Sequence, residues 1–237
     1  MNFPPPMPPP EAPPPPPDAP PARPLRVEGT PDPAPSRALW LVKWLLLIPH
    51  YIVLLLLWIG VVVVSVIAFF AILFTGRYPR ALFDFTVGVL RWNWRVSYYG
   101  YGMLATDRYP PFTLGEAPDY PARLTVAYPE RLSRGLVLVK WWLLAIPHYL
   151  ILAAFSGAGM YSASGSGGWR TPGLIGASVL IVAIALLFTA RYPRGLFNLL
   201  MGLNRWSLRV SVYALLLSDV YPPFRLDQGP LETERPL

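Results

Sequence analysis

The sequence predicts an all-α integral membrane protein made of two tandem repeats, with minor short β-strands on the cytoplasmic side. Three observations lead to this prediction: apolar stretches long enough to cross a bilayer, sequence blocks that occur twice in the same order, and charges confined to the flanks of the apolar stretches. The chain is 54% hydrophobic and only 14% charged, whereas a soluble domain is typically about 25% charged. Each repeat is expected to hold a transmembrane helical hairpin followed by an amphipathic interfacial helix.

The segment 1–36 is dominated by proline and holds 17 of the chain's 31 prolines. Such a segment lacks the N–H donors of a helix and the apolar side chains of a core. We therefore expect a disordered, Pro-rich cytoplasmic tail with polyproline II character. Two roles are open for it: a solvated spacer, or a docking segment for a protein partner.

An internal repeat organises the rest of the chain. Three blocks recur in order: "KWLLLIPHYIVL" (43–54) as "KWWLLAIPHYLIL" (140–152), "FTGRYPRALFDFTVGVLRWNWRV" (74–96) as "FTARYPRGLFNLLMGLNRWSLRV" (188–210), and "DRYPPF" (107–112) as "DVYPPF" (219–224). We place repeat 1 at 37–114 and repeat 2 at 134–227, joined by a linker at 115–133 and followed by a C-terminal tail at 228–237. The linker includes "ARLTVAY" at 122–128, whose alternation is typical of a short strand.

The apolar stretch of repeat 1 is too long for a single straight crossing. No Asp, Glu, Lys or Arg lies between Trp44 and Gly76, which would span roughly 50 Å as one helix, against a hydrocarbon core of about 30 Å. Repeat 2 carries an additional Gly/Ser-rich stretch at 156–173, where the chain has to lie outside the bilayer. Repeat 1 is therefore expected to turn at the equivalent place, near Trp58 to Gly60. The predicted membrane helices are 38–57, 60–76, 134–155 and 173–190.

The distribution of basic residues predicts the orientation. With two crossings per repeat, 19 of the 20 Lys and Arg residues lie on one side of the membrane or at its helix ends, and only Arg170 lies in a loop on the other side. Basic residues are enriched on the cytoplasmic side of membrane proteins. We therefore expect a multi-pass protein of the cell membrane with cytoplasmic N- and C-termini.

Each predicted hairpin is followed by a segment with a single polar stripe. The stripe residues are spaced 4, 4, 3 and 4 in both copies, which is one face of an α-helix. Pro79 and Pro193 precede the two segments, as proline at a first helical turn does. A narrow polar stripe on an apolar helix is typical of a membrane interface. The stripes are Arg80, Asp84, Gly88, Arg91 and Arg95 in repeat 1, and Arg194, Asn198, Gly202, Arg205 and Arg209 in repeat 2.

The blocks KW…IPHY, FTGRYPR, RW…RV and D-x-YPPF resemble a family of bacterial membrane proteins, common in actinobacteria, that is described only as a domain of unknown function. The resemblance covers about 37–114 and 122–227. It supports the duplicated architecture and implies no activity, substrate or cofactor.

The only histidines, His50 and His148, both lie in Ile-Pro-His-Tyr, near mid-bilayer by helical rise. An ionisable residue at that depth is a functional candidate, and the two could face each other as a proton relay or metal pair. Alternatively, each imidazole, or the hydroxyl of Tyr51 or Tyr149, bonds the backbone group freed by the preceding proline. A metal site needs more ligands than these helices offer, so no metal and no cofactor is expected.

Four other charged residues of the repeats have local interpretations. Lys43 and Lys140 are expected to extend toward the headgroups from the helix starts. The spacing from this lysine to the histidine differs by one residue between the copies, so the two are not expected to keep a fixed register. Asp107 and Asp219 precede the Pro-Pro turns, where a capping or turn hydrogen bond is expected.

The arginines are the better candidates for ligand contacts, because guanidinium groups bind phosphate oxygens with two hydrogen bonds. We expect them to contact anionic lipid headgroups, although general interfacial anchoring would use the same charges. The candidates are Arg77, Arg80, Arg91, Arg95, Arg191, Arg194, Arg205 and Arg209.

These features favour a non-enzymatic membrane scaffold or anchor. The alternative is a small transporter or an oligomeric channel with parallel repeats, and a homo-oligomer is compatible with either function. A lipid-modifying enzyme would need an acid, base or metal set that the sequence does not display. Nucleic acid is not an expected partner, because the chain has no long basic run.

Overall fold

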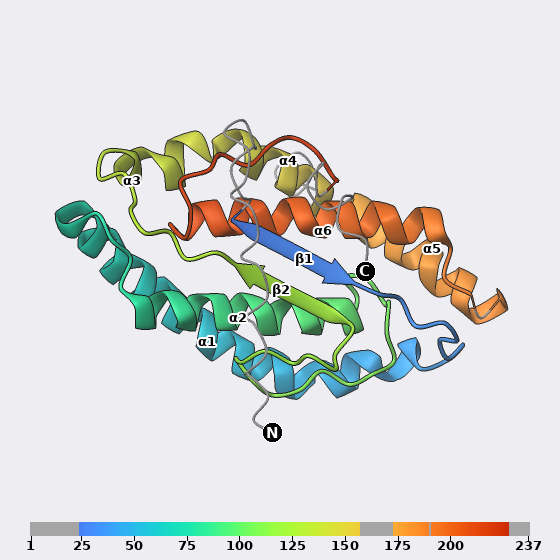
Figure 1. Ribbon diagram of the computed structural model, residues 1–237. Coiled ribbons are helices and arrows are strands. Elements are labelled where there is room, and N and C mark those ends of the chain that lie inside the picture. Colours follow the sequence, from blue (N-terminus) through green and yellow to red (C-terminus); the bar gives the residue numbers. More distant parts are fainter. Residues whose placement is uncertain (1–23, 157–172, 190, 228–237) are drawn as a thin grey trace, which may run out of the picture.

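The computed structural model describes residues 24–156, 173–189 and 191–227 (Figure 1). This part of the chain is mostly helical and includes a two-stranded sheet. The elements in chain order are β1 (Leu25–Gly29), α1 (Trp40–Thr75), α2 (Arg80–Tyr99), β2 (Ala122–Val126), α3 (Leu136–Val139), the π-helical turn η1 (Lys140–Leu144), α4 (Ile146–Ser156), α5 (Leu174–Thr189) and α6 (Arg194–Ala214). Two helical stretches, Trp40–Thr75 and Leu136–Ala153, are long and apolar enough to cross a membrane.

The two strands are equivalent parts of the two repeats. β1 and β2 each end seven residues before a Ser-Arg pair that leads into the first apolar helix of the repeat. They pair antiparallel, with the central residue Val27 opposite the central residue Leu124 and the first residue of each strand opposite the last of the other. This register relates the strands by a local twofold axis through the Val27–Leu124 pair.

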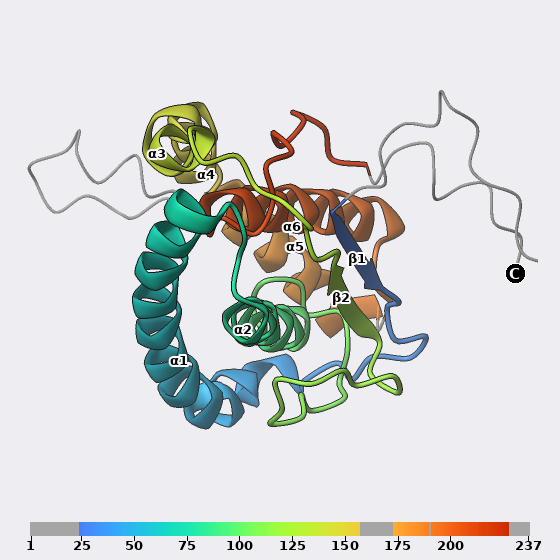
Figure 2. The same cartoon turned by 60° about the vertical axis from the view of Figure 1, so that its left-hand side comes forward.

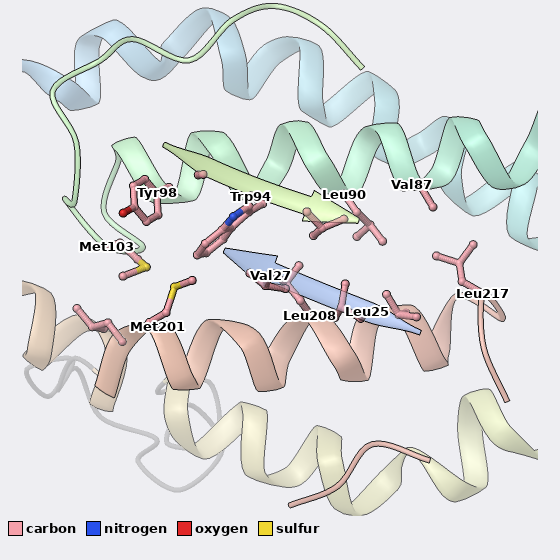
Figure 3. Packing of buried hydrophobic residues seen from close by; sticks show 14 of the residues in the cluster. Leu25, Val27, Val87, Leu90, Trp94, Tyr98, Met103, Met201, Leu208 and Leu217 are labelled. Atoms are coloured by element: carbon pink, nitrogen blue, oxygen red, sulfur yellow. The ribbon is translucent and has the colours of Figure 1, made fainter. Parts of the chain in front are cut away.

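The polar-striped helices α2 and α6 form the centre of the molecule. α2 packs against β2, and α6 packs against β1. Figure 3 shows Trp94 of α2 and Leu208 of α6 directed toward the strands, where they meet Val27 in one hydrophobic core. The expectation of an exposed interfacial helix is therefore wrong for α2, most of which is buried. Its polar stripe has protein partners on the inside of the fold, described below.

The expected turn near Trp58 to Gly60 is also wrong, because α1 runs unbroken through these residues. Figure 2 shows α1 as an arc that bends around α2, on the side of α2 away from the sheet. A single helical glycine costs only about 1 kcal/mol, and here it allows a close approach. A Cβ at Gly60 would lie 3.2 Å from the ring of Phe85 on α2. The long apolar stretch of repeat 1 therefore forms one curved helix, and not two straight helices joined by a turn.

In repeat 2 the predicted helices 134–155 and 173–190 agree closely with α3 to α4 and with α5. The loop that separates them in the prediction lies largely outside the described residues, as does its Arg170. Among the described residues of repeat 2, the apolar helical elements are α3 to α4, ending at Ser156, and α5, starting at Leu174, where repeat 1 has the single helix α1.

The tail and linker predictions need one correction. The strand expected within 122–128 is present as β2, but its partner β1 lies inside the segment expected to be disordered. Leu25 and Val27 are buried in the core, since the duplicated unit begins earlier than the helical blocks suggest. The remainder of the Pro-rich tail, 1–23, and the tail after 227 lie outside the described residues.

Candidate functional site

In each repeat, a buried lysine of the first helix pairs with the aspartate of the D-x-YPPF block near the end of that repeat. Lys43 Nζ lies 3.0 Å from an Asp107 carboxylate oxygen and donates a hydrogen bond to the carbonyl of Thr106 at 2.7 Å. In repeat 2, Lys140 Nζ lies 2.7 Å from the carboxylate of Asp219. Both lysines are buried. The expectation that they extend to the headgroups is therefore wrong: each is held inside by the aspartate of its own D-x-YPPF block.

The same two aspartates also bond the backbone at the entrance to the repeat. Asp107 accepts a hydrogen bond from the N–H of Ser36 at 2.5 Å, and Asp219 accepts one from Ser133 at 2.6 Å. These bonds join segments 71 and 86 residues apart, and the N-cap residues of α1 and α3 form no side-chain cap bond, so the local turn or capping bond expected at the Pro-Pro turns is not what these carboxylates form. Together with the ion pair, the backbone bond means that one carboxylate joins the beginning of a repeat to its end.

The extra residue of repeat 2 is absorbed by the π-helical turn η1, Lys140–Leu144. A π-helical turn accommodates one additional residue within a helix. Lys43 and His50 are seven residues apart, whereas Lys140 and His148 are eight apart, yet all four side chains are buried. The expectation that lysine and histidine lose their common register is wrong, because the turn restores it.

Each histidine lies in an aromatic box. The His50 ring stacks on Phe112 with centroids 3.9 Å apart and also contacts Tyr109. Its Nδ1 accepts a hydrogen bond from the indole N–H of Trp92 at 3.0 Å. In repeat 2, the corresponding partners of His148 are Trp206, Tyr221 and Phe224.

The ring contacts of each histidine come from its own repeat. The box joins the IPHY block, the RW block and the YPPF block in each repeat. The neighbouring tyrosines are on the outside: Tyr51 and Tyr149 are both exposed, and the Tyr149 hydroxyl donates to the carbonyl of Trp141 at 2.8 Å. Trp141 lies six residues before Pro147, so this is not the carbonyl one turn before the proline to which a tyrosine or imidazole is expected to bond.

Arg91 and Arg205 connect the two repeats. Arg91 Nε donates a hydrogen bond to the carbonyl of Leu124 on β2 at 3.0 Å, and Arg205 Nε donates one to the carbonyl of Val27 on β1 at 3.2 Å. The accepting residues are the central pair of the sheet. Each repeat thus uses its arginine to hold the strand of the other repeat, which extends the twofold relation from the strands to the helices.

Arg95 and Arg209 hold the chain that follows the YPPF blocks. Arg95 donates to the carbonyl of Thr113, and Arg209 donates to the equivalent carbonyl of Arg225. Burial lowers the pKa of Arg95 to about 10, because desolvation penalises the charged form. The guanidinium remains charged at neutral pH.

The stripe glycines allow that same chain segment to lie close to the helices. A Cβ at Gly88 would lie 2.9 Å from the Cβ of Leu114, and one at Gly202 would lie 2.8 Å from the Cβ of Leu226. The stripe is therefore a docking face for the repeat's own C-terminal segment.

The remaining candidate arginines are on the surface. Arg77, Arg80, Arg191 and Arg194 are exposed, and they occupy the Arg-Tyr-Pro-Arg segments that directly follow the apolar helices α1 and α5. Arg80 pairs with Asp84 at 3.4 Å, as expected from their spacing, and both are well exposed.

Two arginines that sequence reasoning missed complete a basic cavity. Arg131 and Arg134 line a cavity of about 540 Å³ together with Arg77, Thr75, Gly76 and Leu132. The missed signal was the basic Arg-Leu-Ser-Arg segment at the boundary predicted between the linker (115–133) and repeat 2 (134–227), whose two arginines were not considered as a pair.

The apolar helices expose a broad face. On α1 the side chains of Leu55, Leu56, Val62 and Phe74 are all more than 60% exposed, and on α5 Phe188 is 74% exposed. A contiguous apolar surface of this kind marks an interaction site.

One protein family matches the chain. Its description is "Domain of unknown function (DUF4389)", and the matched residues are 37–113 and 173–225, more than half of the chain. Two matched segments agree with the duplication seen in the blocks and in the sheet. The second segment begins after the first helices of repeat 2, so the π-helical turn lies outside it. No curated protein and no solved structure matches the chain.

Proposed function

Because the chain belongs to this family of unassigned function, and carries its domain in two tandem copies, we propose a function from the geometry: a non-enzymatic membrane anchor or scaffold that holds anionic lipid headgroups. The observation that carries the proposal is the position of exposed arginines at the ends of the apolar helices. In both repeats an Arg-Tyr-Pro-Arg segment with two exposed arginines directly follows an apolar helix that has many exposed side chains.

In this proposal, the exposed apolar face of α1 inserts into the membrane. The arc of α1 lies on the side of α2 opposite the sheet (Figure 2), and its buried residues form one stripe while its other sides are exposed apolar residues. Burial of apolar surface contributes roughly 25 cal/mol per Å², so this face favours a lipid environment strongly. We place the sheet on the cytoplasmic side, as the distribution of basic residues predicts for both chain termini.

The arginines at the helix ends then lie at headgroup depth. Arg77 and Arg191 each follow the last turn of an apolar helix by two residues. A guanidinium at this level meets phosphate oxygens, and each basic residue near an anionic membrane surface contributes about 1 kcal/mol. The inward arginines of the stripes have hydrogen-bond partners within the protein. We therefore assign the contact with lipid phosphates to the arginines at the helix ends, Arg77 and Arg191.

The lipids that co-purify with the full chain in a mild neutral detergent test this function. We expect anionic phospholipids to be enriched over the bulk membrane extract. Arg77→Gln combined with Arg191→Gln should reduce this enrichment several-fold, because one guanidinium is lost at each helix end.

A matched control removes the same charge elsewhere. Arg26→Gln combined with Arg123→Gln changes equivalent positions of the two strands, on the sheet side, and should leave the enrichment unchanged. Wild-type protein that carries lipids in the bulk ratio, or an equal loss in both variants, would contradict the proposed function.

A further inference from the structure

The basic cavity described above lies at the junction of the two repeats. Arg77 follows the end of α1 in the middle of repeat 1, whereas Arg131 and Arg134 lead into the first helix of repeat 2. The N–H of Leu132 donates to the carbonyl of Gly76 at 2.8 Å, which fixes the two segments against each other. Gly76 has a φ of 71°, a conformation that glycine adopts without strain, and it ends α1 at this point.

The three guanidinium groups have no competing partners in the structure as described. Over residues 24–156, 173–189 and 191–227, none of them forms an ion pair or donates a side-chain hydrogen bond. All three are exposed, and the residues lining the cavity include no acidic side chain. This differs from the four inward arginines of the stripes, which are bound to backbone carbonyls: Arg91, Arg95, Arg205 and Arg209.

The field of α1 itself opposes an anion here, but weakly. The C-terminal end of a helix carries about half a negative charge. Three full positive charges around one cavity outweigh it. The volume of about 540 Å³ is within the range of roughly 300–1,000 Å³ that is typical of small-ligand sites.

The sequence does not repeat this set of three arginines at the equivalent place in the other half of the duplication. Matching Ser133 with Ser36 aligns Arg134 with Arg37, but Ala34 stands where Arg131 would be and Pro35 where Leu132 would be. Proline has no N–H to make the bond that Leu132 makes to the end of α1. The duplication therefore supplies the complete set of three arginines once.

We infer that Arg77, Arg131 and Arg134 form a single binding site per chain for a phosphate-bearing anion, with the phosphate group bound among the three guanidinium groups. The inference rests on the proposed function, because it assigns one defined headgroup position within the general anionic contact. The same chemistry fits a lipid phosphate at the membrane surface and a free phosphate from the cytoplasm.

Calorimetric titration of the full chain in neutral detergent distinguishes these sources. The probes are dioctanoyl phosphatidate, dioctanoyl phosphatidylcholine and inorganic phosphate. We expect saturable binding of phosphatidate at one molecule per chain, and a loss of at least tenfold in affinity for Arg131→Gln combined with Arg134→Gln. Charge-assisted hydrogen bonds of this kind are the stronger ones, and Arg26→Gln combined with Arg123→Gln serves as the control with unchanged affinity.

Saturable binding of inorganic phosphate at the same stoichiometry and with the same loss would also support the site and would assign it to a free phosphate. Affinity that is unchanged in Arg131→Gln plus Arg134→Gln would overturn it, provided that helical content matches wild type. If that happens while anionic lipids still co-purify through Arg77 and Arg191, the general function stands and only this site is wrong. If anionic lipids are not enriched at all, the proposed function fails first.

Discussion

Individual residues in the blocks bind one another within each repeat. Lys43 and Asp107 come from different blocks 64 residues apart, and they meet as a buried ion pair. Lys140 and Asp219 repeat the arrangement. Removing one partner of a buried pair leaves an uncompensated charge, which is far more costly than removing both.

Lys43→Met is therefore expected to destabilise the protein by about 3 kcal/mol, at the lower end of the usual range because Asp107 is partly exposed. For a chain of this size the melting temperature should fall by roughly 6–12 °C, as measured by tryptophan fluorescence in mild detergent. Lys43→Met combined with Asp107→Asn should recover most of the loss, since asparagine still accepts the bond from Ser36. A double variant as unstable as the single one would show that charge pairing is not the cause.

At the scale of elements, one π-helical turn keeps two unequal sequences in the same geometry. Within η1, Trp142 is half-exposed and uses its indole N–H only on the carbonyl of Leu138, one turn away. Removing it would give "KWLLAIPHY", the spacing of repeat 1. Deleting one residue from a regular helix rotates the part after the deletion by about 100° relative to the part before it. A deletion within η1 should avoid this rotation, because it removes the additional residue that the π-helical turn accommodates.

Deletion of Trp142 should therefore leave Lys140 and His148 buried and change the melting temperature by less than about 3 °C. The matched deletion of Leu46 falls in a regular part of α1 that has no additional residue. It should turn Lys43 and His50 onto different faces of the helix and lower the melting temperature severely. Thermal unfolding of the two variants side by side makes the comparison. Equal losses in both would show that η1 does not compensate for the extra residue.

The elements also show where sequence reasoning succeeded and where it stopped. Apolar length located α1, α4 and α5, and alternation located β2. Periodicity found the arginine stripe, but the same spacing describes a helix that faces headgroups and one that faces its own chain, so the partners of Arg91 and Arg205 could not be read from it. The turn near Gly60 was predicted from apolar length and from the Gly/Ser-rich stretch of repeat 2, and it is absent from α1 because a curved helix has no local sequence signature that length or repeat alignment would detect.

At the scale of the whole molecule, the duplication forms an internal pseudo-dimer. The strands pair about the Val27–Leu124 position, and each repeat's arginine bonds the other repeat's strand. Figure 1 shows the consequence: in that view the two strands run between α2 and α6, with α2 on the side of β2, α6 on the side of β1, and α1 and α4 farther out. The duplication could be predicted from the sequence. The position of the twofold axis could not, because it follows from the pairing register of β1 with β2, and β1 lies in the segment predicted to be a disordered tail.

The proposal that the exposed apolar face of α1 lies in the membrane is tested most directly by measuring the depth of its residues in a bilayer. The chain has no cysteine, so single spin labels can be placed at Leu41, Val63 and Phe74, all exposed on the arc, after reconstitution into anionic vesicles. Collision with oxygen and with a water-soluble nickel chelate reports the depth of each label. The arc predicts that Val63 is deepest and that Leu41 and Phe74 lie near the same headgroup layer. Labels at Leu41 and Phe74 that are reached from opposite sides of the bilayer, or a Val63 label fully accessible to the nickel chelate, would contradict it.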